Sequence, residues 1–117
     1  MEVAKHVLHQ IKSSNLETPP LRAFVQINET ETLRQAEASR LRHASGNPIS
    51  VLDGVPFSIK EEFDVVGFST TLGTAVYSSI ANSDSTIVAK LKNLGAIVVG
   101  KTNMHEIGKR NKKKCIT

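Results

Sequence analysis

Residues 84–100 read DSTIVAKLKNLGAIVVG, a stretch that predicts a short helix joined to a strand by a single glycine. Ser83, Asp84 and Ser85 are N-cap candidates, because their side chains can accept hydrogen bonds from the free amides of a first helical turn. The apolar face of this helix comprises Ile87, Val88, Leu91 and Leu94. Gly95 supplies the left-handed stop, and the apolar run 96–100 is typical of a strand buried on both faces of an α/β sheet.

Upstream of this stretch, further helices and strands alternate. An amphipathic pattern predicts a helix over residues 1–13, and residues 23–27 have the alternation of a short strand. Asn28 precedes Glu31 by three residues, the spacing of an N-cap, so a second helix is expected to run to about His43. Residues 51–59 predict a strand entered through a turn, and residues 63–73 a loop with short extended pieces. This order predicts an α/β fold in which helices pack on a few strands of a mixed sheet.

Length and charge limit the possible classes of protein. The 117 residues suit one domain, and 39% of them are apolar. The net charge of +4 is concentrated in residues 109–117, which hold five basic side chains and no acid, so the rest of the chain is nearly neutral. The one cysteine, Cys115, excludes a disulfide framework and favours a reducing compartment, so a cytoplasmic location is expected. No apolar run is long enough to predict a membrane span.

The motif with most chemical content is DGVPFSIKEEFD, residues 53–64, because Lys60 ends a strongly apolar strand. A lysine buried in a dry interior loses charge and can then act as a general base. The alternative interpretation is a lysine that extends to solvent, or that pairs with Glu61 or Glu62. The residues alone leave both interpretations open. Other motifs are missing: the sequence has no dinucleotide fingerprint, P-loop, nucleophile elbow or H-x-x-x-H zinc pair.

Three ordered blocks give the sequence a resemblance to a known family. They are GVPFSIKE at 54–61, Gly67 with STTLG at 69–73, and DSTIVAKLKNLGAIVVGKTNM at 84–104. Together they resemble the opening part of the amidase signature family, which includes fatty acid amide hydrolases, bacterial and fungal amidases, and the amidase component of glutamyl-tRNA amidotransferase. The resemblance implies that residues 1–108 are the N-terminal part of an amidase signature domain. Residues 109–117 are then a divergent basic tail.

The same resemblance implies a site and a reaction. Lys60 matches the catalytic lysine of a Ser, cis-Ser, Lys triad that hydrolyses amide bonds through an acyl-enzyme. Asn103, Met104, Glu106 and Gly108 match a stretch expected to shape the floor of the substrate site. The substrate is expected to be a small amide, and no metal or organic cofactor is required. The resemblance places both family serines downstream of residue 117, so the chain is expected to be a truncated fragment that is inactive alone.

Two other kinds of function remain open. One is a non-catalytic interaction module, with self-association through unpaired sheet edges. The other is nucleic-acid contact through the basic tail, which is disfavoured because no aromatic residues or folded basic face accompany it.

Overall fold

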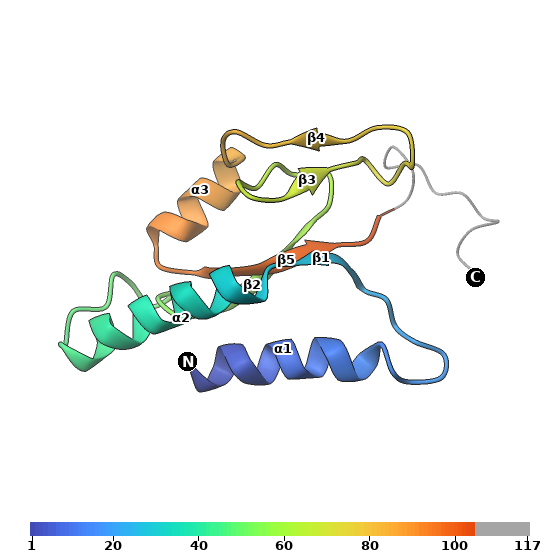
Figure 1. The fold of residues 1–117 in the computed structure, drawn as a ribbon. Coiled ribbons are helices and arrows are strands. Elements are labelled where there is room, and N and C mark those ends of the chain that lie inside the picture. The colour runs from blue at the N-terminus through green and yellow to red at the C-terminus, as the bar shows by residue number, and fades with distance from the viewer. Residues whose placement is uncertain (105–117) are drawn as a thin grey trace.

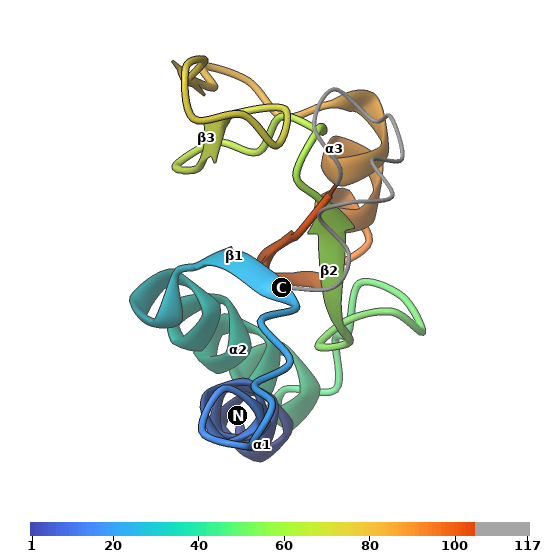
Figure 2. The same cartoon turned by 90° about the vertical axis from the view of Figure 1, so that its right-hand side faces the viewer.

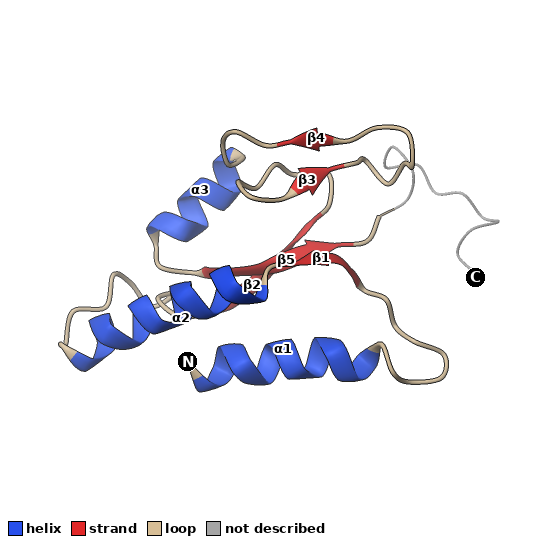
Figure 3. Ribbon diagram, in the orientation of Figure 1, coloured by secondary structure: helices blue, strands red, loops and turns tan. Residues whose placement is uncertain are grey.

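The computed structural model describes residues 1–104. Its helices are α1 (Glu2–Ser14), α2 (Glu29–Ala44) and α3 (Thr86–Asn93). Its strands are β1 (Phe24–Ile27), β2 (Pro56–Lys60), β3 (Ser69–Thr70), β4 (Ser79–Ile80) and β5 (Ile97–Thr102). Strand β5 lies between β1, to which it is antiparallel, and β2, to which it is parallel, while β3 and β4 form a separate small pair. The predicted α/β fold with a mixed sheet is confirmed (Figures 1 and 3).

The sheet separates two layers (Figures 1 and 2). On one side lie α1 and α2, and on the other lie α3 and the β3–β4 pair. Neighbouring residues of β5 belong to different core clusters: Val98 packs with Val65, Phe68 and Val88, whereas Val99 packs with Leu8 and Ile11. The central strand therefore supplies apolar side chains to both layers, as its continuous apolar sequence predicts.

Local signals place two helix boundaries. The Asn28 side chain accepts a hydrogen bond from the Glu31 amide at 3.1 Å, so the predicted N-cap of α2 is confirmed. Gly95 has φ +90° directly after the end of α3, as expected for a helix stop. At the other end of α3, Ser85 is the N-cap residue but makes no capping hydrogen bond with its side chain.

Residues 51–59 contain the expected turn followed by a strand, but the strand is shorter than expected, because β2 begins only at Pro56. Residues 51–54 form turns around the buried side chain of Asp53. Both oxygens of Asp53 accept hydrogen bonds from the Arg42 guanidinium at 2.7 Å, and one of them also accepts from the Ile49 amide at 2.9 Å. The Arg42 guanidinium holds the pKa of the Asp53 carboxyl well below its usual range. This ion pair attaches the turn to α2.

Strands β1 and β2 are the edges of the sheet within the part of the chain that the structure describes, as expected for a small mixed sheet. None of the helices in residues 1–104 is both long enough and apolar enough to cross a bilayer.

Candidate active site at the ends of β2 and β5

Lys60 is the last residue of β2 and lies opposite Thr102 of β5. Its side chain is 46% exposed, and Nζ lies 3.1 Å from Glu62 Oε1. The interpretation of Lys60 as an amine in a dry interior is therefore wrong for this structure. The alternative is confirmed, with Glu62 rather than Glu61 as the partner. The physical reason is the alternation of β2: Phe57 and Ile59 pack against a core cluster, and Lys60 lies on the opposite, exposed face of the strand.

The buried lysine is instead Lys101, whose residue exposure is 0%. Its Nζ donates hydrogen bonds to the Ser69 carbonyl oxygen at 3.0 Å and to Thr70 Oγ1 at 2.8 Å. Thr70 Oγ1 in turn donates to Asp64 Oδ1 at 2.7 Å. Burial lowers the pKa of the Lys101 ammonium, and the nearby charges of Glu61 and Asp64 oppose that shift.

Glu61, which directly follows β2, is buried with an exposure of 1%. Its Oε1 accepts hydrogen bonds from the amide and the hydroxyl of Thr71, the latter at 2.8 Å, and its Oε2 accepts from the Gly73 amide at 3.1 Å. The Glu61 amide donates to the Thr102 carbonyl at 3.1 Å. These hydrogen bonds compensate the Glu61 carboxylate for the loss of water on burial.

A third polar side chain reaches the same segment from β1. Gln26 Oε1 accepts a hydrogen bond from the Ser69 amide at 3.1 Å, and Gln26 Nε2 donates to the Ser69 carbonyl at 2.8 Å. The neighbouring strands β1 and β5 thus each direct one side chain, Gln26 and Lys101, to residues 69–70, and Glu61 reaches residues 71–73 from the end of β2.

Of the residues expected to form the floor of a substrate site, two are described. Asn103 and Met104 follow β5 directly. Because Thr102 of β5 lies opposite Lys60 of β2, these two residues are close to the backbone of Lys60. Asn103 is exposed; its amide donates to the Ala23 carbonyl at 2.8 Å, and its Oδ1 accepts from the Met104 amide at 2.9 Å. Glu106 and Gly108 lie outside the described residues, as does the basic tail 109–117.

Sequence reasoning missed Gln26, Glu61 and Lys101 as members of this cluster. A usable signal existed for Lys101, since it ends the apolar run 96–100 just as Lys60 ends the apolar part of β2. For Glu61 the sequence suggested only a partner for Lys60. Nothing in the local sequence distinguishes Gln26, because its partner Ser69 lies 43 residues away along the chain.

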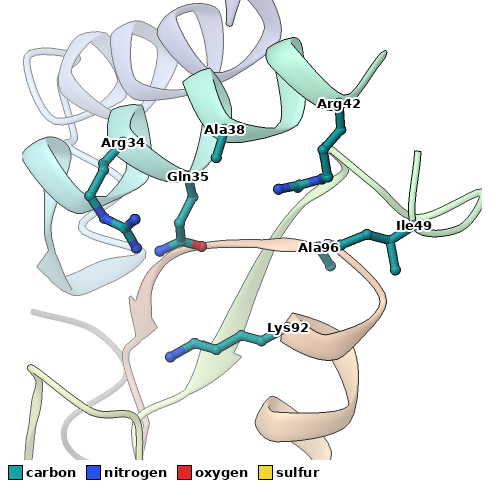
Figure 4. Close-up of a pocket in the computed structure, with 8 residues that line it drawn as sticks. Arg34, Gln35, Ala38, Arg42, Ile49, Lys92 and Ala96 are labelled. Atoms are coloured by element: carbon teal, nitrogen blue, oxygen red, sulfur yellow. The ribbon is translucent and has the colours of Figure 1, made fainter. Parts of the chain in front are cut away.

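A separate hollow of about 240 Å³ lies between α2 and the junction of α3 with β5. Figure 4 shows Arg34, Gln35 and Arg42 of α2 on one side of it, and Lys92 on the other. The full lining is Arg34, Gln35, Ala38, Arg42, Ile49, Lys92, Gly95 and Ala96. The three cationic side chains that line it are each in an ion pair: Arg34 with Glu31, Arg42 with Asp53, and Lys92 with Asp84. None of the candidate site residues lines this hollow, and its charges are balanced.

Comparison with known proteins establishes the family. The family model described as Amidase matches residues 2–111. The chain belongs to the amidase family. It is 39% identical over 110 residues to the fatty acid amide hydrolase of Arabidopsis thaliana, covering 92% of this chain and 18% of that protein. It is 35% identical over 108 residues to the fatty acid amide hydrolase of Oryza sativa subsp. japonica, covering 91% of this chain and 18% of that protein.

Solved structures agree with this membership. The native peptide amidase of Stenotrophomonas maltophilia matches with a TM-score of 0.82 and 26% identity, over 90% of this chain and 21% of that one. The chain therefore spans about a fifth of the length of the relatives that it matches.

Proposed function

We propose that this chain is the N-terminal part of an amide hydrolase, in which Lys60 is the proton-transfer residue of a Ser, cis-Ser, Lys triad. The observation that carries the proposal is the amidase match over residues 2–111, which includes the stretch ending in Lys60. Its placement supports the role. Lys60 stands at the carboxyl end of a parallel strand, with an amine that is half exposed and therefore reachable by other groups.

In the proposed reaction, neutral Lys60 Nζ accepts a proton from a bridging serine, which takes one from the nucleophilic serine as its oxygen attacks the amide carbonyl. The carbon–nitrogen bond then breaks, and the Lys60 ammonium returns a proton through the bridging serine to the leaving amine. Water hydrolyses the resulting ester by the same proton route. The resemblance places both serines downstream of the matched residues, so we expect that residues 1–117 alone do not turn over amides.

Lys60 Nζ must leave its ion pair with Glu62 and release a proton to solvent before it can act as a base. An exposed pair of this kind contributes about 0–1 kcal/mol, so breaking it costs little compared with a catalytic barrier. The proposed substrate is a small molecule with an amide bond.

The test is a chimera in which residues 1–104 replace the matching segment of the Arabidopsis fatty acid amide hydrolase. We expect hydrolysis of fatty acid amides or aryl amides, and its loss by several orders of magnitude on Lys60→Ala. The matched control is Lys90→Ala, which removes an exposed lysine from α3 and should leave the rate unchanged. Full activity of the Lys60→Ala chimera would contradict the proposal, and Lys60-dependent turnover by the isolated chain would contradict its inactivity.

A further inference from the structure

Residues 69–73, Ser-Thr-Thr-Leu-Gly, are held by polar side chains from three separate parts of the chain. Gln26 binds both the amide and the carbonyl of Ser69. Lys101 donates to Ser69 and Thr70, and Glu61 accepts from Thr71 and Gly73. Every residue of the segment except Leu72 therefore makes a hydrogen bond to one of these three side chains, and the segment is held along its length.

Two of the three side chains that hold the segment, Glu61 and Lys101, are ionisable and fully buried, and removing a charged group from water costs free energy. Within residues 1–104, neither Lys101 nor Glu61 takes part in an ion pair with a charged side chain. Their hydrogen bonds go instead mainly to this one segment. Well-packed apolar side chains at such positions are often as stable as buried charges or more so, so stability alone does not account for the arrangement.

The conformation that these bonds hold is strained at one residue. Leu72 has φ +54°, in the left-handed region that costs a side-chain-bearing residue about 1–2 kcal/mol. Glu61 binds the amides on both sides of it, those of Thr71 and Gly73. Strain of this kind persists where the surroundings determine the backbone, and it is frequent at functional sites.

The held segment is connected directly to Lys60. Glu61 is the next residue along the chain, and its amide is bound to Thr102, the residue opposite Lys60. Glu61 thus connects residues 71–73 to the end of β2 through its side chain.

We propose that Gln26, Glu61 and Lys101 are positioning residues, which hold residues 69–73, with Leu72 in its left-handed form, as a rigid support for the end of β2 that carries Lys60. This inference rests on the proposed amide hydrolysis. This support fixes the end of β2 and with it the position of the Lys60 amine. Loss of that placement lowers kcat, since small displacements of reacting groups cost much of the rate.

The experiment uses the same active chimera, with hydrogen exchange measured by mass spectrometry on the peptide that covers residues 69–73. Glu61→Gln keeps the shape of the side chain and removes its charge. We expect faster exchange in that peptide, unchanged exchange in β5, and kcat lower by about tenfold or more with KM changed much less. The matched control is Glu37→Gln on the exposed face of α2, which should change neither quantity.

Leu72→Gly provides a second variant that leaves the buried charges in place. Glycine relieves the strain but allows many conformations, so this chimera should fold normally and still lose kcat. Lys101→Met should behave as Glu61→Gln does. A chimera that is inactive with Lys60 intact refutes the proposed function. If the chimera is active, but neither Glu61→Gln nor Leu72→Gly changes kcat or the hydrogen exchange of residues 69–73, the positioning role alone is refuted.

Discussion

Replacing Asp53 by Asn tests how much of the fold depends on one ion pair. The Asp53 side chain is fully buried, and Arg42 is 31% exposed. The Asp53 carboxylate accepts three hydrogen bonds, two from Arg42 and one from the Ile49 amide. An asparagine turns one of those accepting oxygens into a donor that faces another donor, and it leaves the guanidinium without a counter-charge.

The expected cost follows from burial. Removing one partner of a buried pair destabilises a protein by about 3–5 kcal/mol, and the partial exposure of Arg42 points to the lower end, about 3 kcal/mol. Urea unfolding at pH 7, followed by circular dichroism, measures this difference. The matched control is Glu37→Gln, which breaks a pair of the same two-bond geometry with Arg40 on the same helix, but in solvent. That variant should unfold at nearly the same urea concentration as the wild type.

The pH dependence provides a second, independent check. The pKa of Asp53 is lowered in the folded state, so the unfolded chain binds its proton first as the pH falls. The stabilisation is complete above about pH 4 and is lost progressively below it. The gap between wild type and Asp53→Asn should therefore narrow from pH 4 towards pH 2. An Asp53→Asn loss no larger than that of Glu37→Gln, or a gap that stays constant down to pH 2, would refute the reasoning.

Three further substitutions give defined outcomes. Asn28→Ala removes the cap of α2 and should cost about 1 kcal/mol in thermal unfolding, whereas an unchanged midpoint would argue against the cap. Gly100→Ala places a methyl group against the Gln26 carbonyl of β1, so we expect a loss of about 3 kcal/mol or failure of β1 to pair, read from amide exchange in β1. The pKa of Lys101 is lowered in the folded state, so near its titration the unfolded chain binds more protons than the folded chain. The free energy of unfolding of the wild type, relative to that of Lys101→Met, should therefore rise as the pH increases towards about 10.5, and a decrease over this range would contradict the reasoning.

The features that could be predicted from sequence depend on residues within one or two helical turns. Asn28 and Glu31 are three residues apart, and Gly95 lies directly between a helix and a strand, so each signal is complete within its own segment. The sequence predicts a turn at the entry to β2, but the extent of this turn over residues 51–54 could not be anticipated in the same way. It depends on Arg42, which lies 11 residues before Asp53, and no pattern within residues 51–59 shows that pairing.

The candidate site was harder still to predict from sequence, because its residues are far apart along the chain. Gln26, Glu61 and Lys101 meet at residues 69–73 only because β5 is inserted between β1 and β2. Lys101 and Ser69 are 32 residues apart, and Gln26 and Ser69 are 43 apart. Strand order of this kind is set by non-local pairing, which single-sequence patterns record weakly.

Two lysines each end an apolar strand, and the difference between them follows from which strand is central. Every residue from Ile97 to Lys101 is buried, whereas Ser58 and Lys60 of β2 are exposed in alternation. The longest continuous apolar run thus indicates the central strand, and the lysine that follows it is buried. Two of the three protons of the Lys101 ammonium are engaged by Ser69 and Thr70, while Lys60 has one exposed and weak partner. Of the two amines, only that of Lys60 is available to a reacting group, because exchanging a solvent-exposed ion pair costs little and dismantling a buried network costs much.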